Sequence, residues 1–230
     1  MLCHISISQH LMKEISKTTR VHNLIILDES GSMQSIYDAA LSGANETIQT
    51  IRSAQEKYPD QEHRISFVTF NTFGDYFSSG VNVKTHLDDV PITEASDLEE
   101  KNYQPNACTP LYDAMGIALT HLEGQVEEND RVLVTIITDG YENSSREYSG
   151  KAIKEKVGKL REKGWTFVYI GANQDAVEVA KELDIMNSLN FQADADGTKA
   201  MFEQTNASVL CFYSKIDAGY AGSDENFFDD

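Results

Sequence analysis

The sequence predicts a Rossmann-like, doubly wound α/β fold, with a mostly parallel central sheet, one antiparallel edge strand and helices on both faces. Two runs, 24–27 and 132–138, lack regular polar alternation, which is typical of strands covered on both sides. From about residue 130 onward, strand patterns alternate with amphipathic helix patterns, and right-handed crossovers between such units give a parallel sheet. The segments 64–70 and 76–83 are joined by a short turn, so we expect them to pair antiparallel.

In the first half of the chain, one long helix is expected between two strand regions. The apolar run 21–27 predicts a buried strand. A helix is expected at 35–57, because apolar residues recur there at helical spacing and Pro59 stops it. These apolar residues are Ile36, Ala39, Ala40, Ala44, Ile48 and Ile51. The segment 87–103 is rich in acidic residues and is expected to be a connection that holds one short helix.

In the second half, helices and strands alternate. Thr109-Pro110 is a favourable helix start, because the Thr hydroxyl can cap the helix and Pro at the first helical position wastes no hydrogen bond. The expected helices are 111–122, 149–163, 174–183 and 198–213, and the expected strands are 132–139, 165–170 and 188–192.

Length and composition fit one globular domain. A chain of 230 residues can bury about 70 to 75% of its unfolded surface around a single core. The patterns described above fill residues 20–216, which we expect to form that domain. Residues 1–19 are expected to be an N-terminal appendage, and residues 217–230 an acidic, flexible tail.

The charge and the cysteines limit the classes of partner and compartment. A formal net charge of −18 argues against nucleic acid and anionic membranes, and favours cations and basic partners; it also serves solubility. Cys3, Cys108 and Cys211 are odd in number and far apart, so neither a disulfide framework nor a zinc site is indicated. The first residues lack the basic start of a secretory signal, and no run of eighteen apolar residues occurs. We therefore expect a cytoplasmic protein.

The most informative stretch is Asp28-Glu29-Ser30-Gly31-Ser32, directly after the first predicted strand. Ligands of open α/β sheets bind at the carboxyl ends of the strands, which is where Asp28 lies. The side chains of Asp28, Ser30 and Ser32 stand at alternate positions, so three oxygen groups can converge in an extended turn. Such hard oxygen ligands suit Mg²⁺, Mn²⁺ or Ca²⁺. Glu29 is expected to face the solvent rather than an ion.

Two further stretches place oxygen-bearing side chains at comparable points. Thr109 precedes the helix predicted at 111–122, and Asp139 ends the strand predicted at 132–139. Together with the first stretch, they resemble the metal-ion-dependent adhesion site (MIDAS) of von Willebrand factor A (vWA) domains, whose signature is Asp-x-Ser-x-Ser followed by a distant Thr and a distant Asp. The matching residues are Asp28, Ser30, Ser32, Thr109 and Asp139, and the resemblance covers roughly residues 20–215.

The resemblance implies a divalent metal site with an open position. In the family, the two serines and the threonine bind the ion through their hydroxyl groups, and the aspartates mostly bind its water ligands or orient the serines. The open position is implied to accept an Asp or Glu carboxylate from a partner protein, which completes the octahedron that Mg²⁺ prefers. The family also implies a switch in which the ion exchanges contact with Asp139 for contact with Thr109. Taken singly, each of the five residues could instead be a helix or turn cap.

We therefore expect a protein-binding module that holds Mg²⁺ in its MIDAS, with Mn²⁺ or Ca²⁺ as replacements, no other cofactor and no catalytic residues. The expected partner is a protein that offers an Asp or Glu, not nucleic acid or a membrane. We expect a monomer with weak self-association, in which the acidic tail could supply a carboxylate to the metal of a neighbouring molecule. Two alternatives remain open, namely a metal-dependent hydrolase or phosphatase and an accessory subunit of an AAA-type ATPase or metal-insertion complex.

Overall fold

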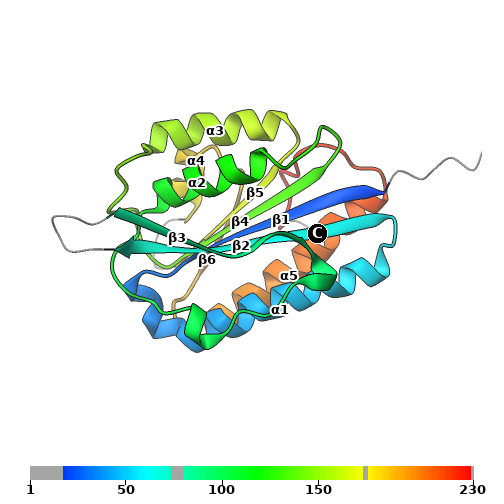
Figure 1. Cartoon of the computed structure of the whole chain (residues 1–230). Coiled ribbons are helices and arrows are strands. Elements are labelled where there is room, and N and C mark those ends of the chain that lie inside the picture. Colours follow the sequence, from blue (N-terminus) through cyan, green and yellow to red (C-terminus); the bar gives the residue numbers. More distant parts are fainter. Residues whose placement is uncertain (1–17, 74–79, 173–175, 229–230) are drawn as a thin grey trace, which may run out of the picture.

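The computed structural model describes residues 18–73, 80–172 and 176–228. Within these ranges the chain forms one six-stranded sheet in the order β3-β2-β1-β4-β5-β6, flanked by helices (Figure 1). The strands are β1 (Thr19–Asp28), β2 (Gln61–Phe73), β3 (Gly80–Pro91), β4 (Arg131–Thr138), β5 (Thr166–Ala172) and β6 (Asn187–Phe191). The helices are α1 (Tyr37–Lys57), α2 (Leu111–Glu123), α3 (Gly150–Glu162), α4 (Ala176–Glu182) and α5 (Ala195–Asp217), with short 3₁₀ helices η1 (Gly31–Ile36), η2 (Ile92–Glu94) and η3 (Glu100–Asn102).

The strand directions confirm the predicted fold class. β1 pairs in parallel with both β2 and β4, and β5 and β6 extend the parallel sheet beyond β4. β3 pairs with β2 in the antiparallel direction and forms one edge of the sheet. The carboxyl ends of the parallel strands therefore lie along one edge, where open α/β sheets bind ligands.

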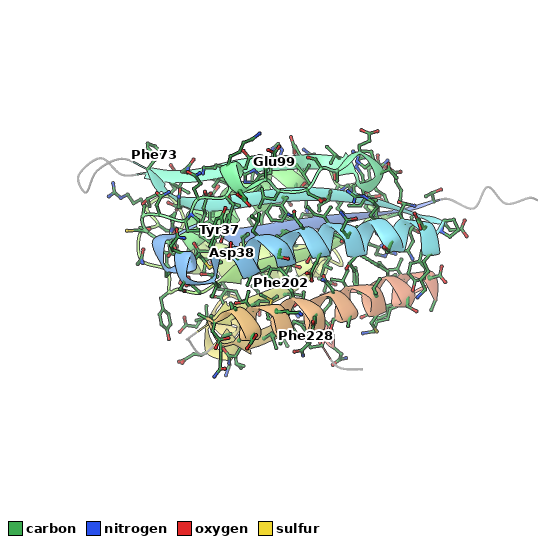
Figure 2. All side chains as sticks on the ribbon, turned by 90° about the horizontal axis from the view of Figure 1, so that it is seen from below. Tyr37, Asp38, Phe73, Glu99, Phe202 and Phe228 are labelled. Atoms are coloured by element: carbon green, nitrogen blue, oxygen red, sulfur yellow. The ribbon has the colours of Figure 1, made fainter. Side chains whose placement is uncertain are left out.

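Each face of the sheet carries its own apolar core. α1 and α5 lie side by side on one face (Figure 2), and α2, α3 and α4 cover the other (Figure 1). Successive side chains of a strand point to opposite faces, so Ile25 and Leu27 of β1 enter the core under α1 and α5, whereas Leu24 and Ile26 enter the other. Burial on both faces explains why this strand shows no polar alternation.

The contact between α1 and α5 is close because Gly43 has no side chain. A Cβ atom at this position would lie 2.0 Å from Cδ2 of Phe202, and the Phe202 side chain is itself buried. Figure 2 shows Phe202 between the two helices.

The edge strand β3 differs from the prediction in position and length. It continues to Pro91, so the prediction of a connection is wrong for residues 87–91. An edge strand has only one partner and is partly solvated, so it tolerates charged residues such as Asp88 and Asp89 that otherwise indicate a loop. Residues 76–79 of the strand predicted at 76–83 lie outside the described residues. The rest of the connection contains η2 and η3 rather than one short helix.

After α5, the described part of the C-terminal segment is held against the sheet. The backbone N–H of Asp224 donates to Oγ1 of Thr166, at the start of β5, over 2.9 Å. The side chain of Asn187 donates to the Asp224 carbonyl and accepts from the N–H of Phe227, which is buried. These contacts hold Asp224 and Phe227, and the flexible tail expected at 217–230 stays a prediction. Sequence patterns gave no sign of the contacts because they join residues far apart in the chain.

The tail carboxylates also have partners. Asp224 pairs with Lys215 at 2.9 Å, and Glu225 pairs with Arg161 at 2.8 Å. Both contacts are made within the chain itself, so they compete with the predicted donation of a carboxylate to a neighbouring molecule. Asp229 and Asp230 lie outside the described residues.

The remaining helices follow the predicted pattern with shifted ends. α5 starts at Ala195, and the side chain of Asp194 caps it by accepting the N–H of Gly197 over 2.7 Å. Of the predicted N-terminal appendage, residues 1–17 lie outside the described residues, and β1 already begins at Thr19. Over the described ranges, none of the helices is both long enough and apolar enough to cross a lipid bilayer.

Candidate metal centre

Two predicted ligands lie at the ends of neighbouring strands. Leu27 of β1 is paired with Ile137 of β4, so the next residues, Asp28 and Thr138, also come side by side. The Thr138 hydroxyl donates to Oδ2 of Asp28 over 2.6 Å. Asp139 follows directly after β4 and reaches the same edge of the sheet.

Asp28 is fully buried and orders its own loop. Its Oδ1 accepts the backbone N–H of Ser30 over 2.7 Å, and its Oδ2 accepts the hydroxyl of Thr138. Burial raises the pKa of Asp28 to about 7, although the hydrogen bonds from Thr138 and Ser30 act in the opposite direction. A buried carboxylate of this kind is stabilised by a nearby positive charge.

The two serines connect Asp28 to Asp139. Ser30 Oγ and Ser32 Oγ lie 3.2 Å apart, and the Ser32 hydroxyl donates to Oδ1 of Asp139 over 2.5 Å. Burial raises the pKa of Asp139, and the hydrogen bond from Ser32 partly offsets this effect. Ser30 is 2% exposed and Asp139 is 7% exposed, whereas Ser32 is exposed to solvent. The group therefore opens to the solvent at Ser32.

Thr109 completes the group from a third loop. Its N–H donates to Oδ1 of Asn143 over 3.0 Å, and the N–H of Asn143 donates back to the Thr109 carbonyl over 3.2 Å. A Cβ atom at Gly140 would lie 3.5 Å from Oγ1 of Thr109 and 3.6 Å from Oγ of Ser32. Both hydroxyl groups thus flank the same glycine, whose missing side chain leaves room between them.

The residues fit a hard divalent cation. All five predicted ligands offer oxygen, and two of them are buried carboxylates. Among the described Lys, Arg and His side chains, none forms an ion pair with Asp28 or Asp139, and the pKa of each carboxyl is raised mainly by burial. A bound cation would offset that cost. In the described ranges there is also no cluster of three or more His, Cys, Asp or Glu suited to a metal, so hydroxyl groups would have to supply part of the ligand set here.

The helix-cap alternative is not supported for the hydroxyl-bearing residues that precede helices. Ser30 stands at the N-cap position of η1, but its side chain makes no capping hydrogen bond. The N-cap of α2 is Pro110, not Thr109, and α2 begins at Leu111. The prediction that the Thr109 hydroxyl caps this helix, with Pro110 as the first helical residue, is therefore wrong. These hydroxyl groups are not engaged in helix capping.

Glu29 lies inside the predicted metal-binding loop 28–32, called the metal loop below, and is where the structure departs most from the expectation. It was expected to face the solvent, but it is fully buried and pairs with Lys84 of β3 at 2.7 Å. A buried carboxylate needs a cation or several hydrogen bonds, and β3 supplies the cation. The sequence gives no signal of this pairing, because Lys84 is 55 positions away and lies one residue beyond the strand predicted at 76–83.

The loop after Asp139 is fixed by two acidic residues, Asp113 and Glu142. The buried Asp113 of α2 accepts backbone N–H groups from Arg146, Glu147 and Tyr148 at 2.7 to 2.9 Å. Glu142 accepts four further hydrogen bonds, from the N–H groups of Ser144, Ser145 and Tyr112 and from the Ser145 hydroxyl. The loop is thereby joined to the first turn of α2, close to Thr109.

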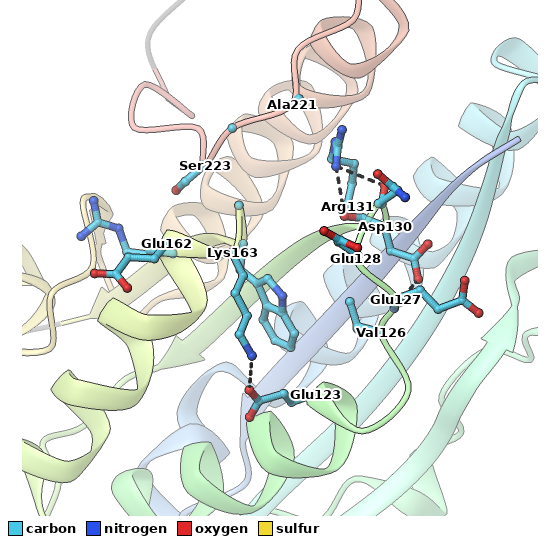
Figure 3. A pocket seen from close by; sticks show the side chains of 15 residues that line it. Glu123, Val126, Glu127, Glu128, Asp130, Arg131, Glu162, Lys163, Ala221 and Ser223 are labelled. Carbon is cyan, nitrogen blue, oxygen red and sulfur yellow. Dashed lines mark hydrogen bonds and ion pairs between the residues drawn. The ribbon is translucent and has the colours of Figure 1, made fainter. Parts of the chain in front are cut away.

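A hollow lies at the opposite end of the sheet, among the turn after α2, the end of α3 and the C-terminal segment (Figure 3). Its volume is about 720 Å³. Lys163 pairs with Glu123 there at 2.7 Å, and Arg131 donates to the carbonyls of Asn129 and Asp130. It contains none of the predicted metal ligands.

The family of the chain follows from a comparison with known sequences. Residues 24–209 match the model of the von Willebrand factor type A domain, which covers most of the chain and all five predicted ligands. The chain belongs to the von Willebrand factor type A domain family. No curated protein sequence matches it.

Solved structures share this vWA fold at low sequence identity. A von Willebrand factor type A protein from Catenulispora acidiphila is 15% identical, with a TM-score of 0.58 over 84% of this chain and 43% of that one. The pilus adhesin SpaC from Lactobacillus rhamnosus GG is 12% identical, with a TM-score of 0.57 over 85% and 30%. Proximal thread matrix protein 1 from the mussel byssus is 15% identical, with a TM-score of 0.52 over 80% and 46%. The chain therefore spans less than half the length of each of these three proteins.

Proposed function

We propose that this vWA domain is a metal-dependent protein-binding module, which recognises an acidic side chain of a partner protein through Mg²⁺ held in its MIDAS. The observation that carries the proposal is the convergence of five oxygen-bearing side chains from three loops. Two of them are buried carboxylates, Asp28 and Asp139, that have no ion pair with any described cationic side chain.

Each residue has a distinct role in the proposal. Ser30, Ser32 and Thr109 would hold the ion through their hydroxyl oxygens, while Asp28 and Asp139 balance its charge and orient the serines. The hydrogen bond to Asp139 directs the Ser32 proton away from the remaining lone pairs of its oxygen. When bound, a divalent ion with an open coordination position supplies the attraction for a partner carboxylate.

The surroundings of the site suit a protein partner better than a small molecule. Phe73 at the end of β2 is 58% exposed, and Tyr141, two residues after Asp139, is 59% exposed. Exposed aromatic side chains are enriched in protein interfaces. Structural neighbours include a pilus adhesin and a matrix protein, which supports binding rather than catalysis as the role of this fold. We propose no catalytic residue.

Isothermal titration calorimetry with MgCl₂ and MnCl₂ tests the metal site. The wild-type protein, stripped with EDTA and dialysed, should bind one ion per chain, and Ser30→Ala should weaken binding at least about tenfold. Ser42→Ala, the same substitution at an exposed position of α1, is the matched control and should bind like the wild type. Absence of heat from the wild-type protein with both metals would refute the proposal.

Affinity capture tests the partner. Proteins retained from a native lysate in MgCl₂, but lost both in EDTA and with Ser30→Ala, are those held through the ion. Acidic-to-amide substitutions in such a protein should then abolish binding. Retention that does not change with EDTA would show that recognition does not use the metal. Sedimentation of the purified chain at increasing concentration tests the expected monomer with weak self-association.

The cytoplasm remains the proposed location, on the strength of the thiols. Cys108 and Cys211 are free, and Cys108 is exposed, as suits a reducing compartment. Cell fractionation tests this placement.

A further inference from the structure

We infer that Glu29 is a positioning residue of the MIDAS: it sets the place of Thr109 relative to the other predicted ligands, and Lys84 of the edge strand holds Glu29 for this role. The inference rests on the proposed metal site. It adds that a residue of β3 helps to fix the positions of the predicted ligands. It gives Glu29 no direct contact with an ion.

The carboxylate of Glu29 joins three separate parts of the chain. Oε1 accepts Nζ of Lys84 over 2.7 Å and the backbone N–H of Gln104 over 2.7 Å. Oε2 accepts the hydroxyl of Thr69 over 2.7 Å. Both oxygens are thus occupied, and the residue is fully buried. The side chain connects the metal loop to β2, to β3 and to the segment that leads to Thr109.

That segment, 103–107, is tied to the metal loop at four points. Besides the bond from Gln104, three contacts use the main chain of the metal loop: Tyr103 Oη donates to the Asp28 carbonyl over 3.0 Å, Asn106 N–H to the Glu29 carbonyl over 2.9 Å, and Gly31 N–H to the Ala107 carbonyl over 3.1 Å. Thr109 follows only two residues after the last of these contacts. Its distance from Ser30 and Ser32 therefore depends on how this segment is held.

The local backbone needs such support. Ala107 has a φ of 61°, in the left-handed region that side-chain-bearing residues disfavour. A chain in this conformation relaxes unless surrounding contacts hold it. The contact from Gln104 to Glu29 lies three residues before the strained residue, and the contact from Gly31 lies on it. Loss of the Glu29 carboxylate therefore removes the one contact of the four that uses a side chain of the metal loop, and leaves this strained segment less firmly held before Thr109.

Lys84 makes the arrangement depend on the edge strand. It lies directly opposite Thr69 in the β2–β3 pair, so both donors reach Glu29 from adjacent strands. His86, two residues further along β3, lies with Nε2 2.8 Å from the Thr69 hydroxyl. Since that hydroxyl donates to Glu29, the His86 nitrogen acts as the donor to Thr69. The position of the Glu29 side chain in the metal loop therefore depends on contacts with two residues of β3.

A double-mutant cycle separates positioning from simple stabilisation of the fold. Mg²⁺ dissociation constants are measured by calorimetry for the wild type, Glu29→Gln, Thr109→Ala and the double variant. Glu29→Gln should weaken Mg²⁺ binding about tenfold or more, as for other groups that orient metal ligands. Because it acts through Thr109, the double variant should bind nearly as well as Thr109→Ala alone. The matched control is Glu123→Gln, which removes an ion-paired carboxylate at the other end of the molecule and should leave binding unchanged.

The outcomes distinguish this inference from the proposed function. A wild type that binds no Mg²⁺ or Mn²⁺ overturns both. If the wild type binds Mg²⁺ and Glu29→Gln binds it with equal affinity, the inference alone is overturned. The same holds if the losses of binding free energy in Glu29→Gln and Thr109→Ala add up in the double variant. A lower Tm of Glu29→Gln in EDTA with unchanged Mg²⁺ affinity assigns Glu29 to the fold only and likewise overturns it. If Glu29→Gln does not fold, Lys84→Met replaces it in the same cycle. This variant keeps the Glu29 carboxylate and its bond to Gln104, so we expect a smaller loss of Mg²⁺ affinity.

Discussion

Ser32 and Asp139 lie 107 positions apart, and the hydroxyl of Ser32 donates a hydrogen bond of 2.5 Å to Oδ1 of Asp139. This contact joins the metal loop to the end of β4, so the protein's own hydrogen bonds bring two predicted ligands together. Thr138 adds a second link between the same loops through Asp28.

Replacing Asp28 by Asn should stabilise the metal-free protein at pH 8. The folded-state pKa of about 7 lies above the usual 3.8, so the stability gained from the protonated carboxyl is present at low pH and is lost as the pH rises toward and through 7. The corresponding cost of charge burial is roughly 4 kcal/mol. Asn avoids this cost, but its amide nitrogen cannot accept one of the two hydrogen bonds that Asp28 accepts, so the net gain should be smaller.

Urea unfolding in EDTA at pH 8 and pH 5 measures this effect. The advantage of Asp28→Asn should shrink at pH 5, and in MgCl₂ at pH 8 the wild type should gain stability while the variant gains none. Asp38→Asn, at an exposed position of α1, is the control and should follow the wild type. A variant that is less stable than the wild type at pH 8 in EDTA would contradict the role of burial.

His63 should make the protein sensitive to acid. Its ring is fully buried, neither ring nitrogen has a hydrogen-bond partner within the described structure, and it packs edge-on against Tyr213 at 4.3 Å. Burial lowers its pKa from 6.5 to about 4. Since the folded-state value lies below the unfolded one, stability is present above pH 6.5 and is lost as the pH falls toward 4.

His63→Phe keeps an aromatic ring against Tyr213 and removes the titration. The fall in unfolding free energy between pH 7 and pH 4.5 should be smaller by roughly 2 to 3 kcal/mol in this variant than in the wild type. Chemical denaturation at the two pH values measures it. His121→Gln, at a largely exposed position, should leave the fall unchanged, and an equal fall in His63→Phe would exclude His63 as its source.

Removing the Asp113 carboxylate should loosen the loop after β4. Asp113→Ala leaves the N–H groups of Arg146, Glu147 and Tyr148 without this acceptor, at an expected cost of about 2 to 3 kcal/mol in unfolding free energy. Hydrogen–deuterium exchange should accelerate most in peptides that contain residues 144–148. Asp38→Ala is the control, and unchanged exchange in this loop would contradict the assigned role.

Gly43→Ala should destabilise the packing of α1 against α5. The added Cβ would meet the ring of Phe202 at 2.0 Å, and overpacking of this kind costs about 1 to 3 kcal/mol. Gly158→Ala in α3 is the matched control, because its Cβ would meet nothing closer than Oδ2 of Asp184 at 3.3 Å. Thermal unfolding should show a lower Tm for Gly43→Ala and an equal or higher Tm for Gly158→Ala.

The fold was predictable because its strands are buried on both faces. Runs such as 24–27 are apolar without interruption, and ligands of parallel sheets gather at the strand ends, so Asp28 and Asp139 could be placed at one edge from sequence alone. β3 was not predictable to the same extent. Its charged residues, Lys84 among them, are typical of a loop, and only pairing with β2 makes them part of a strand.

The supports of the site were beyond sequence patterns for a related reason. Glu29, Asp113 and Asn143 each act through partners that only the tertiary fold brings near. Acidic and amide side chains are usually exposed, so the residue type alone predicts a solvent-exposed side chain. Asn187 shows the same for the tail, since its side chain holds two residues of a segment 37 to 40 positions away.

Both ends of the described chain lie at the amino edge of the sheet. Thr19 begins β1 there, with its N–H bonded to the Asp60 carbonyl, and Asp224 is bound at the start of β5. The predicted ligands lie at the other edge. A biotin or affinity handle attached at residue 18 or residue 228 would orient an immobilised molecule with the predicted ligands toward the bulk solution, so surface-based binding assays need not obstruct the face that they probe.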